Sequence, residues 1–267
     1  MNEFKQITSP QNPLVKQLLL LKEKSRERRK SGLFLVEGRQ ELRLALESGY
    51  MLHSVFFNKE ICNDIAFWDT LPLPKTGFNK ASISREIYQK LAYRKTTEGV
   101  LALLHAKEHR LEDLDLTAQN PLLLVAQAPE KPGNIGALLR SADAAQVHAV
   151  IIVDPKTDLY NPNSIRSSVG ALFTNSIALA STARALDYLK GRNISIFSAA
   201  LDTPKVYTEV DFTGPTALVM GTESTGLSRE WLERADQNIY IPMKGKIDSL
   251  NVSVSASILI FEALRQR

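Results

Sequence analysis

The sequence predicts an α/β protein with two domains: a C-terminal, mostly parallel sheet with helices on both faces, and a smaller N-terminal α/β domain. From residue 121 onward, short apolar strands alternate with helical segments, which is the pattern of a parallel sheet covered by helices. Residues 1–105 carry strands and helices of their own, and the polar residues 106–120 lack a sustained apolar period. We therefore expect one domain at 1–105, a linker at 106–120 and a second domain at 121–267.

The N-terminal domain begins with a predicted helix in which the apolar residues Leu14, Val15 and Leu18 precede a charged run. A second helix ends at Gly49, a residue that commonly follows the last helical turn. The expected helices cover residues 13–30, 39–48 and 84–91, and the expected strands cover residues 34–36, 54–58 and 100–105.

The C-terminal domain begins with apolar runs at residues 122–126 and 150–153, as expected for parallel strands that are buried on both faces. Further strands are expected at residues 176–180, 194–198, 217–220 and 238–241, and helices from residue 134 and at 163–172, 183–190, 229–234 and 252–265. Ligands of such sheets lie beyond the carboxyl ends of the strands. The loops that begin near residues 132, 221 and 242 follow three strands and are the candidate site.

The composition indicates an ordinary globular protein, with 44% hydrophobic and 23% charged residues. The single cysteine, Cys62, can form neither an internal disulfide nor a zinc site, so a reducing compartment is expected. The longest apolar runs, residues 18–21 and 122–126, are far shorter than the ~20 residues that span a bilayer. The N-terminus lacks the pattern of a secretory signal, and we expect a cytoplasmic protein.

The positive charge is concentrated at the N-terminus. Residues 1–30 contain eight Lys and Arg and three Glu, a balance of +5, whereas the whole chain carries only +4. Such a cluster can neutralise nucleic-acid phosphates, or it can be a solvated helix face paired with Glu23 and Glu27; the residues alone favour neither reading. The candidate nucleic-acid-binding residues in this run are Lys22, Lys24, Arg26, Arg28, Arg29 and Lys30.

The two glycine-containing loops do not fit the common nucleotide-binding motifs. Residues 221–226 lack the Gly-Lys-Ser/Thr ending of a P-loop, and residues 133–136 lack the spacing of a dinucleotide fold. For each loop taken by itself, the alternative to a ligand-binding role is a structural one, as a tight turn or the start of a helix, with Asn134 as an N-cap. The histidines at 53, 105, 109 and 148 have no metal-ligand spacing, and no metal is expected.

Three motifs in a fixed order resemble those of the SpoU/TrmH branch of the SPOUT methyltransferases. They are Asn-Ile-Gly-Ala-Leu-Leu-Arg at residues 134–140, Gly-Thr-Glu-Ser-Thr-Gly-Leu at residues 221–227, and Ile-Pro-Met at 241–243 followed by Ser-Leu-Asn-Val-Ser at 249–253. The resemblance implies transfer of a methyl group from S-adenosylmethionine to a ribose 2′-hydroxyl of RNA, a deep trefoil knot in the C-terminal domain, and a homodimer. Residues 7–13 and 34–38 resemble the RNA-binding domain of ribosomal-RNA members.

The resemblance also implies roles for individual residues. Catalysis is assigned to Arg140 with Asn134, Glu223 and Asn251, and Arg166 lies in a stretch near the catalytic face where it can contact RNA. A guanidinium is protonated far above neutral pH, so for Arg140 a phosphate clamp is physically easier than a general base. The cofactor is expected to contact Gly221, Ile241 and Leu250, with walls from Gly226, Pro242, Met243, Ser249 and Ser253.

Ribosomal RNA is the expected substrate, because the N-terminal extension is a whole domain. Transfer RNA is the alternative within the same chemistry. A non-catalytic RNA-binding or ribosome-assembly protein on the same fold is the alternative of a different class, and the complete cofactor loops argue against it.

Overall fold

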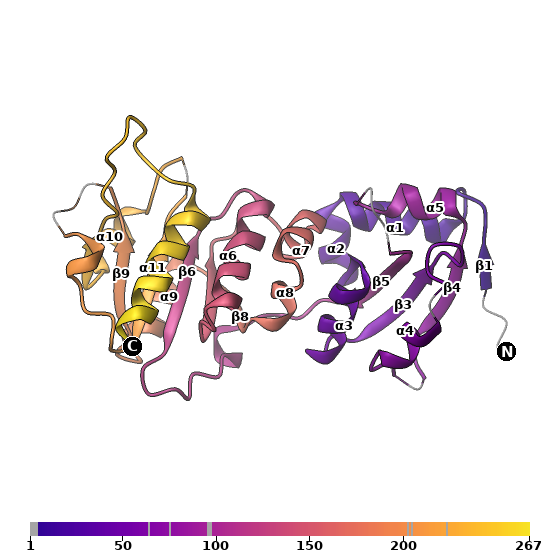
Figure 1. The fold of residues 1–267 in the computed structure, drawn as a ribbon, viewed down its shortest axis with the longest axis horizontal. Coiled ribbons are helices and arrows are strands. Elements are labelled where there is room, and N and C mark those ends of the chain that lie inside the picture. Colours follow the sequence, from indigo (N-terminus) through magenta and orange to yellow (C-terminus); the bar gives the residue numbers. More distant parts are fainter. Residues whose placement is uncertain are drawn as a thin grey trace. The chain divides into compact units, whose positions relative to one another are not determined.

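The computed structural model describes residues 5–63, 65–74, 76–94, 98–201, 203, 205–222 and 224–267 (Figure 1). Its contacts divide the chain into two compact units. The N-terminal unit consists of Met1–Lys107 with Tyr160–Thr174, and the C-terminal unit consists of Glu108–Leu159 with Asn175–Arg267. A segment of the expected catalytic domain, Tyr160–Thr174, therefore packs with the N-terminal unit.

The N-terminal unit is a five-stranded mixed sheet with the strand order β1-β4-β3-β5-β2. β1, β4 and β3 are parallel, whereas β5 runs antiparallel to both β3 and β2. The strands are β1 (Lys5–Ile7), β2 (Leu33–Glu37), β3 (Leu52–Phe57), β4 (Asn79–Ile83) and β5 (Val100–His105). The helices of its first segment are α1 (Pro13–Glu23), α2 (Ser25–Ser31), α3 (Arg39–Glu47), α4 (Ile65–Thr70) and α5 (Arg85–Leu91).

The helix expected at residues 13–30 is divided at Lys24, whose backbone is extended. α1 begins where the Asn12 side chain accepts a hydrogen bond from the Leu14 amide. Across the break, Arg28 donates from Nη1 to the carbonyl oxygens of Leu21 (2.6 Å) and Lys22 (3.2 Å). These bonds satisfy carbonyl groups that the end of α1 leaves open.

Arg28 corrects one of the sequence predictions. Its side chain is only 4% exposed, and its guanidinium joins the two helices. It therefore stabilises the N-terminal unit and is not accessible to an RNA phosphate. Charge counting did not reveal this, because a sequence count does not separate buried cations from exposed ones.

The helix expected at residues 163–172 is also divided, into α7 (Pro162–Ser168) and α8 (Ala171–Thr174). Val169 (φ 54°) and Gly170 (φ 94°) adopt left-handed backbone between them. An aromatic cluster holds this segment in the N-terminal unit: the Tyr160 ring stacks on Phe34 with 4.1 Å between centroids, and Phe173 meets Tyr50 edge-on. Arg166 on α7 is therefore fixed to the same unit as the basic run.

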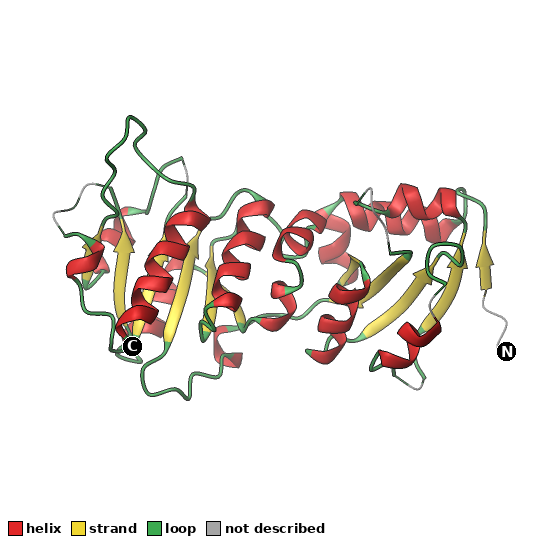
Figure 2. Cartoon of the chain, in the orientation of Figure 1, coloured by secondary structure: helices red, strands yellow, loops and turns green. Residues whose placement is uncertain are grey.

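The C-terminal unit is a six-stranded, fully parallel sheet with the order β11-β9-β10-β6-β7-β8. The strands are β6 (Leu122–Gln127), β7 (Ala149–Val153), β8 (Ile177–Ala180), β9 (Ser195–Ala199), β10 (Thr216–Met220) and β11 (Gln237–Ile239), and the main helices are α6 (Pro132–Ala144), α9 (Thr182–Lys190), α10 (Arg229–Arg234) and α11 (Val252–Gln266). α6 and α11 pack together on one face, and α9 and α10 cover the other (Figure 2).

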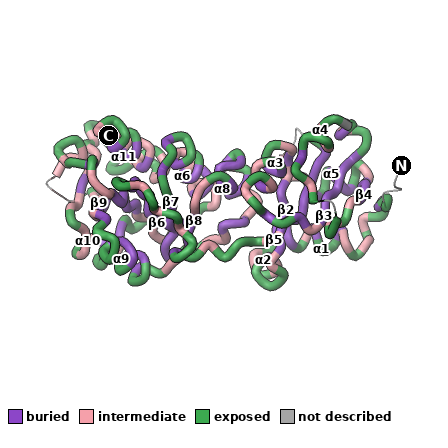
Figure 3. The backbone as a smooth tube through the Cα atoms, turned by 90° about the horizontal axis from the view of Figure 1, so that it is seen from below, coloured by how far each residue is buried: buried purple, intermediate pink, exposed green. Residues whose placement is uncertain are grey.

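Burial follows this layering, because most strand residues of both sheets are buried (Figure 3). On the face under α9 and α10, alternate residues such as Leu123, Val125 and Val219 pack with Leu186 and the fully buried Trp231. The predicted α/β architecture, with a parallel sheet between helices and a smaller N-terminal α/β domain, is confirmed.

Within the described ranges, no helix combines the length and the apolar character that crossing a membrane requires.

Candidate functional site

A hollow of about 490 Å³ lies at the carboxyl ends of three adjacent strands in the C-terminal unit. β9, β10 and β11 end at Ala199, Met220 and Ile239, and all three of these residues line it. Parallel strands expose their carboxyl ends at one edge, so loops that are far apart in sequence converge there. Of the predicted cofactor residues, six line the hollow: Gly221, Gly226, Ile241, Met243, Ser249 and Leu250.

The loop after β10 is closed by its own backbone. Thr222 and Gly226 exchange two hydrogen bonds, from the Thr222 amide (3.0 Å) and from the Gly226 amide (3.1 Å). This pairing brings Gly226 so close to Gly221 that a Cβ at residue 221 would lie 2.3 Å from the Gly226 carbonyl carbon. Gly226 itself has φ 69°, which favours glycine. Both glycines are therefore required by the shape of the loop.

The opposite wall comes from the chain after β11 and from the start of α11. Tyr240 is fixed by backbone bonds, since its amide donates to Lys205 (3.0 Å) and its carbonyl accepts from Tyr207 (3.1 Å). Ile241, before the exposed residues 244–248 in the sequence, and Leu250, after them, both line the hollow.

Two of the residues expected in the cofactor wall do not line the hollow. Pro242 is exposed, and Ser253 lies in the first turn of α11. The amide and the hydroxyl of Ser253 both donate to Asn251 Oδ1, at 2.9 and 2.6 Å. Asn251 is thus the N-cap of α11.

Asn134 and Asn251, which are 117 positions apart, meet between the first turn of α6 and the N-cap of α11. Asn251 Nδ2 donates to Asn134 Oδ1 at 3.3 Å. One and a half to two turns further along the same two helices, the Ser141 and Ser257 hydroxyls lie 2.8 Å apart, so α6 and α11 run parallel. A second hollow of about 20 Å³ joins Asn134 to Gly221, Thr222 and Val252. The structure therefore brings two of the four predicted catalytic residues to the cofactor loops.

Arg140 lies on the exposed surface of α6, six residues beyond Asn134 or about 9 Å along the helix axis. It lines neither hollow. Within the described part of the chain, no hydrogen bond or ion pair holds its guanidinium. All of its donors are consequently available to a ligand. Glu223, the fourth predicted catalytic residue, lies outside the described residues.

Part of the hollow is lined by residues outside the three sequence motifs. Ala200, Leu201, Leu232 and Ser255 also line it. The strand before Ala200 is expected from the sequence, but the loop that follows it carries none of the three motifs. The rule that ligands lie beyond the carboxyl ends of strands would have included the loop after β9 as well.

The predicted RNA-binding residues lie in the N-terminal unit. Lys24, Arg26, Arg29 and Lys30 are exposed, and so is Arg166, which donates to Asn163 Oδ1 at 3.0 Å. Lys22 is half-buried. Among the described residues, no three His, Cys, Asp or Glu side chains are grouped so that they could hold a metal ion.

Known proteins resemble the chain over its whole length. The SpoU rRNA Methylase family matches residues 121–261, and the MRM3-like substrate binding domain matches residues 12–102. The chain is 31% identical over 260 residues to RlmP of Bacillus subtilis, a 23S rRNA guanosine 2′-O-methyltransferase. The aligned region covers 97% of this chain and 98% of RlmP.

Two solved structures extend the comparison. A crystal structure of an RNA 2′-O ribose methyltransferase has a TM-score of 0.84 and 37% identity and covers 98% of both chains. The SpoU methyltransferase AviRb from Streptomyces viridochromogenes, solved with the cofactor AdoMet, has a TM-score of 0.84 and 27% identity and covers 96% of this chain and 98% of AviRb. Two of its three motifs line one hollow, the start of the first adjoins the same loops, and the chain belongs to the SpoU rRNA methylase family.

Proposed function

We propose that this chain transfers the methyl group of S-adenosylmethionine to a ribose 2′-hydroxyl of ribosomal RNA. The observation that carries the proposal is the convergence of the motif loops on one hollow at the edge of a parallel sheet, beside the paired Asn134 and Asn251. Family membership over the full chain supports the same activity. Ribosomal RNA is favoured over transfer RNA because RlmP, an rRNA enzyme, matches both units.

The hollow fits S-adenosylmethionine in size and in lining. Its volume of about 490 Å³ lies within the range of about 300–1,000 Å³ that small-molecule sites occupy. Apolar side chains such as Leu227 and Leu250 alternate with backbone and with the hydroxyl groups of Thr222 and Thr225. When bound, the cofactor supplies a sulfonium methyl group that is already electrophilic.

The protein then has to orient the ribose oxygen and stabilise the charge that develops on it. Orientation alone can supply much of the acceleration. We assign Arg140 to an RNA phosphate beside the reacting ribose, because a guanidinium binds phosphate through two parallel hydrogen bonds and stays protonated. Asn134 and Asn251 hold the starts of α6 and α11 together next to the cofactor loops.

Methyl transfer from tritiated S-adenosylmethionine tests the proposal. The purified chain is expected to label ribosomal RNA from a strain that lacks the gene and to leave RNA from the parent strain unlabelled, because there the site is already modified. Absence of label from both RNAs, with RNA binding retained, would favour the non-catalytic alternative. We also propose that the protein works in the cytoplasm, where ribosomal RNA and a reducing environment are found.

Four exposed lysine and arginine residues of the N-terminal run are expected to supply salt-dependent affinity for RNA. Replacing Lys24, Arg26, Arg29 and Lys30 together with glutamine removes up to four phosphate contacts. The slope of log affinity against log salt should then fall by up to about 3, with cofactor affinity unchanged. Arg28 is retained in this variant because it is buried.

A control variant with the same change in charge replaces four exposed basic side chains on or near α9 and α10 with glutamine. These residues are Arg184, Lys190, Arg192 and Arg229. We expect this control to keep the salt slope of the unsubstituted chain. Equal slopes for all three proteins in a salt titration would assign the N-terminal run to solubility alone.

We further propose a homodimer that packs through the C-terminal unit. Val254, Phe261 and Leu264 form one stripe of α11, and each is at least 36% exposed. Covering such apolar surface is favourable. Light scattering at low micromolar concentration should give about twice the 29.7 kDa of the chain. A value near one chain mass would contradict the dimer, and Phe261→Lys should produce that value if the stripe is the interface.

A further inference from the structure

One large aromatic side chain of the N-terminal unit is exposed beside two cations. Tyr93, two residues beyond the end of α5, is 47% exposed. Lys22 Nζ lies 5.5 Å from the centroid of its ring, and Arg166 Cζ lies 5.6 Å from it. The three residues come from α1, from the chain after α5 and from α7, and they belong to one compact unit.

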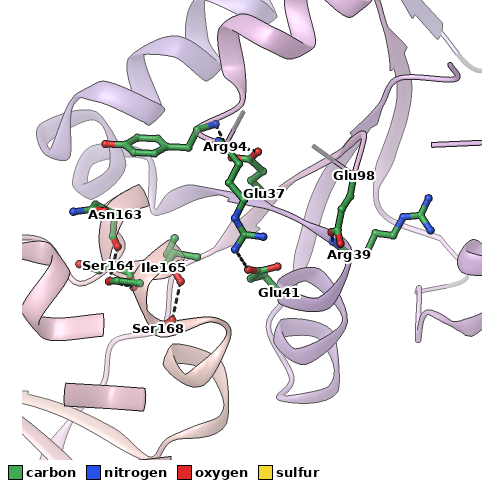
Figure 4. Close-up of polar contacts among 11 residues, drawn as sticks. Glu37, Arg39, Glu41, Arg94, Glu98, Asn163, Ser164, Ile165 and Ser168 are labelled. Atoms are coloured by element: carbon green, nitrogen blue, oxygen red, sulfur yellow. Dashed lines mark hydrogen bonds and ion pairs between the residues drawn. The ribbon is translucent and has the colours of Figure 1, made fainter. Parts of the chain in front are cut away.

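The backbone under Tyr93 is held by a carboxylate. Glu37 accepts a hydrogen bond from the Tyr93 amide at 2.6 Å and from the Arg94 amide at 3.3 Å. Arg94 in turn pairs with the buried carboxylate of Glu41 (Figure 4). Burial raises the pKa of Glu37, against the opposing effects of the two amides, Arg94 and Lys22. The aromatic ring thus stands on a backbone that is fixed before any ligand arrives, which lowers the entropy cost of binding.

Both cations are fixed by bonds that leave donors available. Lys22 Nζ donates to the carbonyl oxygens of Lys90 (2.9 Å) and Ala92 (3.0 Å), and an ammonium has three N–H donors. Arg166 is exposed and donates from Nη2 to Asn163 Oδ1 (3.0 Å), whereas a guanidinium has five N–H donors. Each side chain can therefore keep its present partners and still bind a phosphate.

The hollow at the base of the ring is too small for a ligand group. It measures about 20 Å³, which is space for about one water molecule. A ligand must consequently lie on the exposed surface of the ring. Bases of single-stranded RNA stack on aromatic rings in this way, and phosphates bind neighbouring Lys and Arg side chains.

We propose that Tyr93, Lys22 and Arg166 form a binding site for one unpaired nucleotide of the RNA substrate, with the base on the Tyr93 ring and its phosphates on the two cations. That the ligand is RNA rests on the proposed function. Glu37 is a positioning residue, since its carboxylate holds the Tyr93 amide. The site gives the N-terminal unit a contact with a flipped or looped-out base, in addition to non-specific attraction by the basic run.

Fluorescence anisotropy with fluorescein-labelled octauridylate tests the site by binding alone. Tyr93→Leu should weaken binding about tenfold, the usual effect of losing one stacked base, while Tyr93→Phe should stay within about twofold of the unsubstituted chain. Leu20→Ala is the matched control, because Leu20 lies in the same unit and is also 47% exposed. It should bind as the unsubstituted chain does, and equal melting temperatures establish that the variants are folded.

Stacking has a spectroscopic signature that a structural role for Tyr93 would lack. In Tyr93→Trp the new indole should be quenched by octauridylate. Trp68 and Trp231 contribute background fluorescence. This background is measured on the unsubstituted chain and subtracted. Arg166→Gln should lower the salt dependence of octauridylate binding and leave part of the quenching.

Unchanged octauridylate affinity in Tyr93→Leu, together with an unquenched indole, would overturn the site. If those two results came with weaker binding to intact ribosomal particles, Tyr93 would contact a protein and the RNA site would again be wrong. The proposed function is tested separately by methyl transfer. If the chain binds octauridylate through Tyr93 but labels no RNA, the nucleotide site is supported and the proposed methyltransferase activity is wrong.

Discussion

Arg140→Ala is expected to lower methyl transfer about 100- to 1,000-fold, the usual effect of removing one donor that stabilises charge in a transition state. Arg140 is exposed on α6, lines neither hollow, and is held by no other described residue. Cofactor affinity should therefore be unchanged, because the walls of the hollow stay intact. Single-turnover methyl transfer at saturating RNA and calorimetric titration of S-adenosylmethionine measure the two effects.

Arg140→Lys separates charge from geometry. Lysine keeps the positive charge but loses the planar pair of donors, so a phosphate clamp predicts partial rescue at most. Arg184→Ala is the matched control: Arg184 is an exposed arginine on α9, paired with the exposed Glu112, and its loss should change turnover little. Near-normal turnover in Arg140→Ala would show that the catalytic assignment is wrong, and Asn251 would be the next residue to test.

Gly221→Ala is expected to weaken cofactor binding about 5- to 150-fold. A Cβ at this position would lie 2.3 Å from the Gly226 carbonyl carbon and 2.5 Å from the Leu227 amide nitrogen. These atoms belong to one peptide group, and backbone cannot yield as a flexible side chain would, so the paired Thr222 and Gly226 must separate and the wall of the hollow must move. Overpacking of this kind costs about 1–3 kcal/mol, which corresponds to the stated range of affinity.

Gly245→Ala provides the control for this variant. Gly245 lies in the loop between β11 and α11, and a Cβ there would meet nothing within 4 Å. It should bind S-adenosylmethionine as the unsubstituted chain does. A Gly221→Ala chain with unchanged cofactor affinity and an unchanged melting temperature would mean that the hollow is not the cofactor site.

The sheet of the C-terminal unit could be predicted because its strands are apolar on both faces. The runs that contain Leu124 and Ile151 read as buried strands without any tertiary information, and the structure extends them by one residue each. The break at Lys24 could not be predicted, because it is stabilised by Arg28 through contacts across the helix ends. β1 has three residues, which is too short for any period to be visible.

The candidate site was predictable where the backbone itself constrains the sequence. Gly221 and Gly226 stand in a loop that directly follows a strand, where glycines indicate a close backbone approach or a positive φ. The structure shows the close approach at Gly221 and the positive φ at Gly226. The meeting of Asn134 with Asn251 depends on how α11 returns to α6, and spacing along the chain carries no information on it. The trefoil knot, which only the family resemblance suggested, stays a prediction about the path of the chain. The role proposed for Tyr93 is not predictable, because one exposed aromatic residue carries no sequence signal.

The proposed methyl transfer by Arg140 and the cofactor loops is tested by a map of 2′-O-methylated positions in ribosomal RNA from cells with the gene, without it, and with the Arg140→Ala variant in its place. We expect one or a few ribose positions that are methylated with the gene, unmethylated without it, and still largely unmethylated with the variant. Three identical maps would contradict the proposal.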